Sequence, residues 1–298
     1  MSFIRAMPPL TNATGRATLG NKRFTLKLEK GQVEAGPAGV LDASGSVFTV
    51  PDTRQKPSTG EITIHAAGPL VAALTVLNEP PLRIMDRAQR EPDIAEAEAV
   101  AVAKVRLPLK DGIKREEVFY DVSATLRNIS SDNIVIGRTL TSREMVLNAT
   151  PEGVGLDGPL RLDGVPARAS WRQPLGEAAA KGATVEGTIE LSDTTMKNLN
   201  IPLPDGMIGG RGTGTYRLAL PVQEPPQLTL TSDLEGVSLA IDELDWRKSE
   251  SATGGLELSA TLGEVPVVED LSLSAPGLAL SGRIELSEED GFSDITFD

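Results

Sequence analysis

The strongest constraint on this 298-residue chain is an alternation of apolar and polar residues with a period of two. Such alternation places one set of side chains on one face of a pleated strand and the other set on the opposite face. Turn-forming residues, such as Asp157-Gly158, Asp163-Gly164 and Pro276-Gly277, separate these segments at short intervals. An apolar face opposite a Thr, Ser and Glu face is typical of antiparallel sheets. We therefore predict an all-β protein, built as a sandwich, a barrel or a long meander.

A short helical insert is expected where the alternation breaks, within residues 68–92. After Gly68-Pro69 the apolar residues Leu70, Val71, Leu74 and Leu77 follow a helical spacing, and Pro80-Pro81 ends the segment. A second short helix is expected from Leu82 to Gln89. The Ala-rich residues 95–103 are compatible with helix by composition, but their strict alternation favours a strand. This divides the chain into a β segment over 1–67, the insert over 68–92 and a repeated β segment over 93–298.

Composition excludes several classes of function. The chain has no cysteine and a single histidine, His65, so thiolate chemistry, zinc–cysteine sites and multi-histidine metal sites are not expected. Its net charge of −13 and its ten aromatic residues argue against nucleic-acid binding, which uses basic patches and stacking platforms. No calcium-loop motif is present in the sequence. We predict neither a cofactor nor a metal.

Two motifs that resemble functional ones have simpler interpretations. Residues 209–214, Gly-Gly-Arg-Gly-Thr-Gly, precede an expected strand instead of the helix that a dinucleotide fingerprint requires, so we predict a turn or bulge. His65 has no nucleophile motif beside it, so we expect a structural or exposed histidine and no enzyme. A hydrolase that uses His65 as its base is the least favoured alternative.

The negative charge is concentrated near the C-terminus. Residues 251–298 contain ten acidic residues and one basic residue, Arg283, and therefore contribute −9 of the −13. We interpret this as a solvated outer face with an acidic tail. The alternative is an acidic surface, including Glu288, Glu289 and Asp290, that docks a protein partner.

The chain resembles the AsmA/TamB-like proteins of Gram-negative bacteria, and is most similar to the YhdP-like branch. The similarity covers roughly residues 15–285 and consists of architectural signatures instead of catalytic motifs. They are Phe48–Asp52, Gly68–Leu74, Asn78–Leu82, Ile136–Arg138, Leu162–Trp171, Gly187–Asp193 and Leu234–Val237.

The resemblance implies an elongated, curved antiparallel sheet, or taco-like meander, whose concave face is an apolar groove. Such proteins are anchored in the inner membrane, extend through the periplasm and support phospholipid transport to the outer membrane without covalent chemistry. The chain lacks the anchor of that family and ends in the middle of an expected strand, so we expect a fragment of a larger protein. Membrane contact is then expected through parts of the parent protein that are absent here.

Under this interpretation the function is a non-enzymatic lipid conduit, with phospholipid acyl chains as partners. The alternative is a structural or assembly module of the cell envelope that docks an envelope protein through its acidic C-terminal strands. Alternation gives two faces without saying which is concave, and the same pattern lines any sandwich core. The candidate groove residues are Leu26, Leu28, Ile62, Ile64, Ile189, Leu191, Leu218, Leu220, Leu228, Leu230, Leu271 and Leu273.

Overall fold

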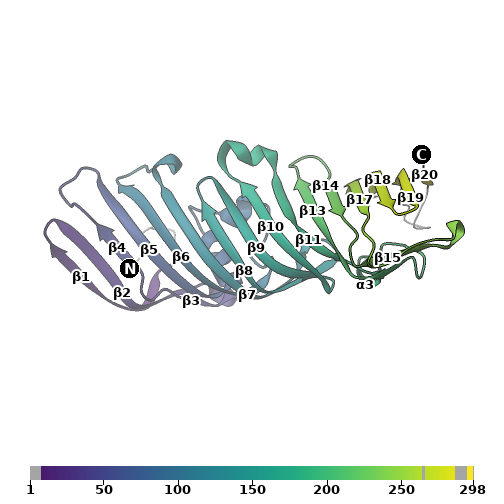
Figure 1. Ribbon diagram of the computed structural model, residues 1–298. Helices are drawn as coiled ribbons and strands as arrows, with labels where there is room; N and C mark the ends of the chain where they lie inside the picture. Colours follow the sequence, from purple (N-terminus) through teal and green to yellow (C-terminus); the bar gives the residue numbers. More distant parts are fainter. Residues whose placement is uncertain (1–7, 264–265, 286–293, 298) are drawn as a thin grey trace. The chain divides into compact units, whose positions relative to one another are not determined.

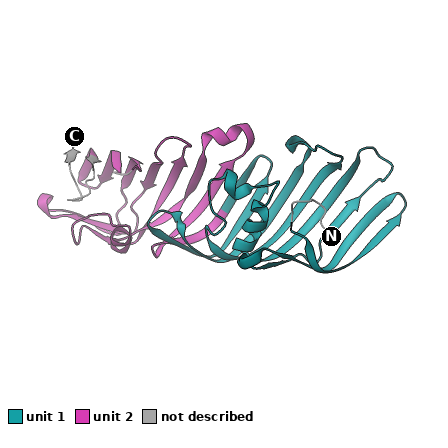
Figure 2. Ribbon diagram, turned by 180° about the vertical axis from the view of Figure 1, so that it is seen from behind, with its two compact units in different colours: residues 1–156 teal, residues 157–298 magenta. Residues whose placement is uncertain are grey.

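A computed structural model describes residues 8–263, 266–285 and 294–297 of the chain. These residues confirm the predicted fold class, an all-β protein dominated by antiparallel pairing with short helices inserted (Figure 1). The chain forms two compact units, residues 1–156 and 157–298, and the division falls within a strand (Figure 2). Each unit is therefore described by itself.

The first unit is an antiparallel sheet that follows the order of the chain, except that β3 and β4 both lie between β2 and β5. β2 pairs with β1 along its length, and with β3 and β4 on its other side. The ladder then continues through β4–β5, β5–β6, β6–β7 and β7–β8. The strands are β1 (Leu10–Gly20), β2 (Arg23–Glu34), β3 (Val40–Asp42), β4 (Val47–Val50), β5 (Ser58–Pro69), β6 (Glu96–Leu109), β7 (Phe119–Val135) and β8 (Arg138–Thr150).

The helical insert of the first unit lies where the sequence predicts it. α1 (Leu70–Asn78) begins directly after β5, and α2 (Ile84–Arg87) follows the two prolines at 80 and 81. Gly68 allows this abrupt change of direction, because its φ of +150° suits glycine and an added Cβ would lie 2.7 Å from the carbonyl oxygen of Val40. The Ala-rich residues from Glu96 onward form β6, which confirms the prediction of a strand there.

α1 packs through its smallest side chains. Ala72 is fully buried against Ala35 and Leu41, and Val33 and Val76 complete this cluster. Ala fits here because the helix lies close to the sheet, and α1 has no side-chain N-cap to hold it otherwise. Packing therefore fixes the helix on the sheet.

The second unit repeats this plan with a different insert. Strands from β9 to β20 pair as neighbours, and the ladders run β9–β10–β11–β13–β14–β17–β18–β19–β20. A separate three-stranded sheet is formed by β12, β15 and β16. The strands are β9 (Gly153–Leu162), β10 (Val165–Pro174), β11 (Ala183–Leu191), β12 (Ile208–Gly210), β13 (Gly212–Leu220), β14 (Gln227–Ser232), β15 (Val237–Ile241), β16 (Trp246–Lys248), β17 (Gly255–Thr261), β18 (Val267–Ala275), β19 (Leu278–Glu285) and β20 (Asp294–Phe297).

The insert of the second unit begins with α3 (Asp193–Asn198), which is held by a true N-cap. The hydroxyl of Ser192 accepts a hydrogen bond from the backbone N–H of Thr195, at 3.2 Å. An ion pair of 2.9 Å between Lys197 and Asp193, four residues apart, supports the same helix. Short 3₁₀ helices complete the secondary structure at Gly36–Ala38, Arg115–Glu117, Gly176–Lys181 and Asp242–Leu244.

The structure corrects one predicted turn. β9 runs without interruption through Asp157-Gly158, and the actual turn lies at Asp163-Gly164, where both residues have positive φ. Asp157 lies within the strand, and its carboxylate forms a 2.8 Å ion pair with Arg172 of β10. A hydrogen bond from the Arg172 guanidinium holds the pKa of Asp157 below its usual value. The second predicted motif, at residues 209–214, is the connection between β12 and β13 and confirms the turn interpretation.

The packing of α1 gives a stability prediction. Replacing Ala72 by leucine adds volume to a fully buried site, and we expect the free energy of unfolding to fall by about 1–3 kcal/mol. Ala88→Leu is the control, because Ala88 is exposed at the end of α2 and should change stability by less than about 0.5 kcal/mol. Chemical denaturation of both variants checks this. Equal stability of Ala72→Leu and the wild type would show that α1 is not docked.

Candidate functional site

The strand register of the first unit collects apolar side chains on one face of the sheet. One row runs Leu26–Phe48–Ile62–Val105–Tyr120, each residue directly paired with the next across β2, β4, β5, β6 and β7. Because alternate residues point to opposite faces, the intervening rows form a polar face. One of these polar rows is Thr49–Glu61–Arg106, in which opposite charges meet across β5 and β6.

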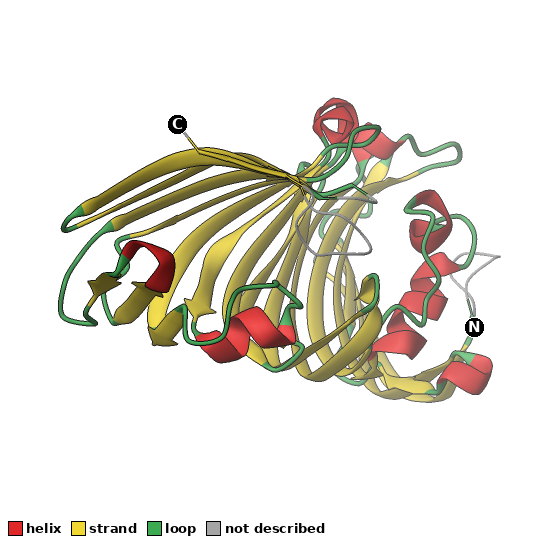
Figure 3. Ribbon diagram, turned by 90° about the vertical axis from the view of Figure 1, so that its right-hand side faces the viewer, coloured by secondary structure: helices red, strands yellow, loops and turns green. Residues whose placement is uncertain are grey.

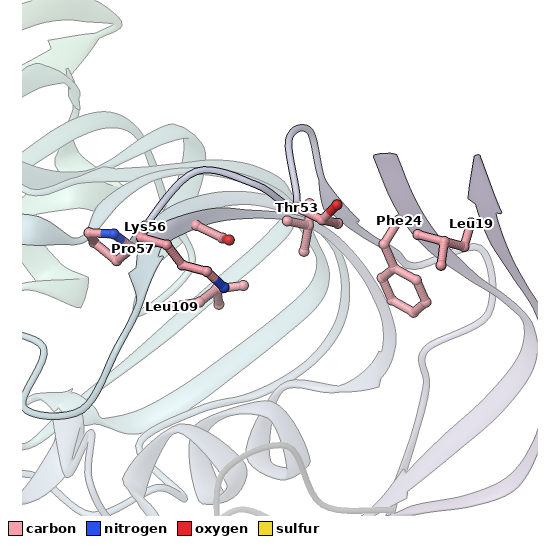
Figure 4. A pocket seen from close by; sticks show the side chains of 8 residues that line it. Leu19, Phe24, Thr53, Lys56, Pro57 and Leu109 are labelled. Atoms are coloured by element: carbon pink, nitrogen blue, oxygen red, sulfur yellow. The ribbon is translucent and has the colours of Figure 1, made fainter. Parts of the chain in front are cut away.

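The apolar face is the concave face of this sheet. The strands curve over the side chains of Leu19, Phe24, Thr53 and Leu109, which point to the inner side (Figure 4). The helices of the same unit lie inside this curve (Figure 3). The structure therefore answers, for the first unit, which face is concave, a question that alternation leaves open.

The insert covers only one end of this concave face. The row Ala99–Leu126–Met145, near α1 and α2, is buried, with exposures of 7%, 6% and 4%. Farther from the helices, Ile64 is 38% exposed and Leu19 is 74% exposed. Among the described residues of this unit, the elements packed on the concave face are the helices with their adjoining loops. Much of the apolar surface is therefore open to a ligand.

A hollow of about 420 Å³ marks the open end of the face. Phe24 contributes to its wall and meets Phe48 edge-on, with ring centroids 6.2 Å apart. Its lining comes from the ends of β1, β2, β4, β5 and β6 and from the loop between β4 and β5. The residues are Leu19, Phe24, Val50, Thr53, Lys56, Pro57, Ser58 and Leu109.

The second unit has an apolar face built in the same way. The row Gly187–Tyr216–Leu230–Leu258–Leu271 crosses β11, β13, β14, β17 and β18 by direct pairing. The opposite face carries a ladder of Thr, Ser and charged residues. Its neighbouring row is Thr188–Thr215–Thr231–Glu257–Ser272.

The three-stranded sheet covers one end of this second apolar face. Leu191, Leu234 and Val237 form a buried cluster, with exposures of 5%, 2% and 0%. Ile208 of β12 and Leu239 of β15 pack against the same cluster. Val185, Leu218 and Leu228 lie outside it and are half-buried. The partial cover seen in the first unit is thus repeated with a different element.

A buried lysine stabilises this cover. Lys248 of β16 is 3% exposed, and its Nζ donates hydrogen bonds to the carbonyl oxygens of Leu234 and Val237, both at 2.7 Å. A third bond of 3.2 Å reaches the carbonyl of Ser249. Burial lowers the pKa of Lys248, although the nearby Asp233 opposes the shift. The three carbonyls explain how the chain tolerates this buried ammonium.

The structure places all twelve predicted groove residues on the apolar face of their own unit. Leu26, Leu28, Ile62 and Ile64 belong to the first unit and are half-buried or exposed. The others lie in the second unit, where they divide into two sets. Leu191 is buried beneath the three-stranded sheet, Ile189, Leu230 and Leu273 pack against its cluster, and Leu218, Leu220, Leu228 and Leu271 lie outside that cluster.

Several residues of these faces were not anticipated from the sequence. In β6 the odd-numbered residues are all apolar, whereas the even-numbered set mixes Val100 and Val102 with four charged residues. Pairing with β5 places the odd-numbered set on the concave face, because Ile64 lies opposite Ala103 while His65 lies opposite Val102. Phe24 and Phe48 alternate in step with Leu26 and could have been included from that signal.

Tyr216 shows how closely the strands of the second unit approach. A Cβ on Gly187 would lie 1.9 Å from the carbonyl oxygen of Arg168, so only glycine fits there. The ring of Tyr216 lies opposite Gly187, and its hydroxyl donates a 3.1 Å hydrogen bond to that same carbonyl. Burial raises the pKa of the Tyr216 phenol above its usual value.

His65 lies on the polar face of the first unit and is exposed. Its backbone N–H donates a 3.0 Å hydrogen bond to the hydroxyl of Ser46. Within the described ranges no group of three or more Asp, Glu or His side chains is arranged to hold a metal ion. Glu288, Glu289 and Asp290, which carry the docking alternative, lie outside the described residues.

No family model, curated protein or solved structure matches the chain. None of the helices in the described part of the chain is both long and apolar enough to cross a membrane.

The Tyr216 hydrogen bond gives a prediction for alkaline pH. Its phenol has a higher pKa in the folded chain than in the unfolded one, so its contribution to stability is complete below pH 10.0 and is lost as pH rises through the folded pKa. We expect the Tyr216→Phe substitution to lower the free energy of unfolding by about 1 kcal/mol at neutral pH, because it removes this hydrogen bond. It should also remove the phenol transition of Tyr216 from an absorbance titration.

Tyr120→Phe is the matched control, because Tyr120 is half-buried on the apolar face of the first unit and no hydrogen bond to its hydroxyl is found among the described residues. Equal effects of the two substitutions on stability would contradict the role of the Tyr216 hydrogen bond.

Proposed function

We propose that this chain is a non-enzymatic lipid-binding segment that holds phospholipid acyl chains along its apolar sheet faces. In this proposal it belongs to an AsmA/TamB-like lipid-transfer protein, is located in the periplasm and contributes to transport between the inner and outer membranes. The sequence signatures given above support the family. The open apolar faces support the binding mode.

One observation carries the proposal: the concave face of the first unit is apolar across its strands but covered at only one end. Ile62 is half-buried and Ile64 is 38% exposed in a row that continues to Ala103 and Val122. Contiguous exposed apolar surface is unfavourable in water and marks interaction sites in soluble proteins. A ligand that covers this surface therefore stabilises the chain.

Acyl chains have the chemistry that this surface requires. Burial of each CH₂ group contributes about 0.8 kcal/mol, so aliphatic contact alone can hold a long chain. The contact is non-directional, and a chain can slide along it without breaking fixed hydrogen bonds. The polar face meanwhile remains hydrated through residues such as Glu61, Arg106 and Lys104.

A sandwich core is the alternative use of the same alternation. It would require a second sheet over the concave face, as in aligned sheet packing at about 10 Å. In the described part of the first unit, helices and loops occupy one end of that face and no second sheet faces the strands. The observed arrangement therefore supports an open groove in preference to a closed sandwich core.

A pair of exposed β-branched residues on neighbouring strands provides a test. Ile64 is 38% exposed on the concave face, and Val100 is 52% exposed on the opposite face. We expect Ile64→Glu to weaken uptake of a tail-labelled fluorescent phospholipid about tenfold, the loss of roughly two CH₂ contacts. Val100→Glu should leave uptake within about twofold of the wild type.

Delipidated wild-type protein that takes up no labelled phospholipid would contradict the proposed function. Equal loss of uptake in both glutamate variants would contradict the assignment of the concave face. Thermal unfolding of each variant shows that the comparison is made on folded protein.

A further inference from the structure

One cation lies in the apolar hollow at the open end of the first unit. Lys56 lines this hollow together with Phe24, Val50 and Leu109. Its side chain runs toward Leu109 on the inner side of the sheet (Figure 4). A lysine that extends along apolar surface buries its methylene groups while its ammonium remains available to an anion.

The loops at this end hold further positive charge. The backbone N–H of Thr53 donates a 2.8 Å hydrogen bond to the carbonyl of Lys22, which ties the β4–β5 loop to the β1–β2 turn. This brings Arg54 and Lys56 to the same end of the sheet as Lys22 and Arg23. Four cations thus lie at this end of the sheet, in a chain whose net charge is −13, and Lys56 is the one that lines the hollow.

The carboxylate of Asp52, in the same loop, is bound to Arg54 and not to Lys56. Asp52 accepts a 2.9 Å hydrogen bond from the backbone N–H of Arg54, and the Arg54 Nε lies 3.5 Å from the same oxygen. The hydrogen bonds from Arg54, aided by the charge of Lys22, hold the pKa of Asp52 below its usual value. Within the described residues Lys56 forms no ion pair. Its charge is therefore available to a ligand.

We propose that this hollow holds the head-group end of a phospholipid with net negative charge, with Lys56 pairing with its phosphate. The inference rests on the proposed function and specifies the lipid class at this end of the groove. The acyl chain then continues from Phe24 and Val50 onto the concave face. The volume of about 420 Å³ lies within the range of roughly 300–1,000 Å³ found for small-molecule pockets.

Charge complementarity favours an anionic head group over a choline head group. A quaternary ammonium binds where aromatic rings form a cage, and Phe24 is the single aromatic residue in the lining of this hollow. Lys56 also repels a terminal cation such as the choline ammonium, which favours a head group whose only charge is that of its phosphate. A phosphatidylglycerol head group has the required charge.

The experiment compares tail-labelled fluorescent phosphatidylglycerol and phosphatidylcholine with identical acyl chains, on the full chain at low ionic strength. We expect the wild type to bind phosphatidylglycerol more tightly, and Lys56→Gln to weaken that binding by about threefold to tenfold. Lys104→Gln is the control, because Lys104 is exposed on the polar face, opposite Thr63 and Asp121. It should retain the wild-type preference.

Raising the salt concentration provides a second measurement on unmodified protein, because it screens exposed charges. The preference for phosphatidylglycerol should narrow, while phosphatidylcholine binding changes little. Equal affinity for both lipids, or a preference that survives Lys56→Gln unchanged, would overturn the head-group assignment and leave the proposed function standing. Failure of both lipids to bind would instead overturn the proposed function itself.

Discussion

The register of the antiparallel strands is the constraint on which the rest of the structure depends. Direct pairing of Ile62 with Val105, and of Tyr216 with Leu230, brings the apolar members of each strand into continuous rows. A shift by one residue would move every one of these side chains to the other face. The register therefore decides both where the inserts pack and which surface remains available to a ligand.

The two inserts explain why the apolar face of each sheet is covered in part and not completely. In the first unit Ala72 brings α1 close to Ala35 and Leu41. In the second unit a small sheet packs on Leu191, and Lys248 donates hydrogen bonds to the carbonyls of Leu234 and Val237. Each insert buries one end of an apolar face, which stabilises its unit, and leaves the remaining apolar surface half-buried. The covered end of each apolar face thus contributes to stability, and the uncovered remainder is the surface on which the proposed lipid binding depends.

Much of this fold could be predicted from the sequence because its signals are local. Alternation predicts the strands, the helical spacing after Pro69 predicts α1, and the alternation in residues 95–103 outweighs the helix propensity of alanine. The turn at Asp157-Gly158 was predicted wrongly, because the pairing of β9 with β10 continues through these residues and a local window does not show strand pairing. The three-stranded sheet and the role of Lys248 depend on contacts between distant segments. The concave face likewise follows from the pairing and curvature of neighbouring strands, since alternation within one strand does not say which of its two faces is concave.

The central claim is that acyl chains lie on the concave face of the first unit. Photo-crosslinking with a phospholipid that carries a diazirine in its acyl chain, followed by peptide mapping, tests this claim most directly. We predict crosslinks on concave-face residues such as Leu26, Ile62 and Ile64. Crosslinks confined to the polar face, at Thr63 and Lys104, or distributed equally over both faces, would contradict it.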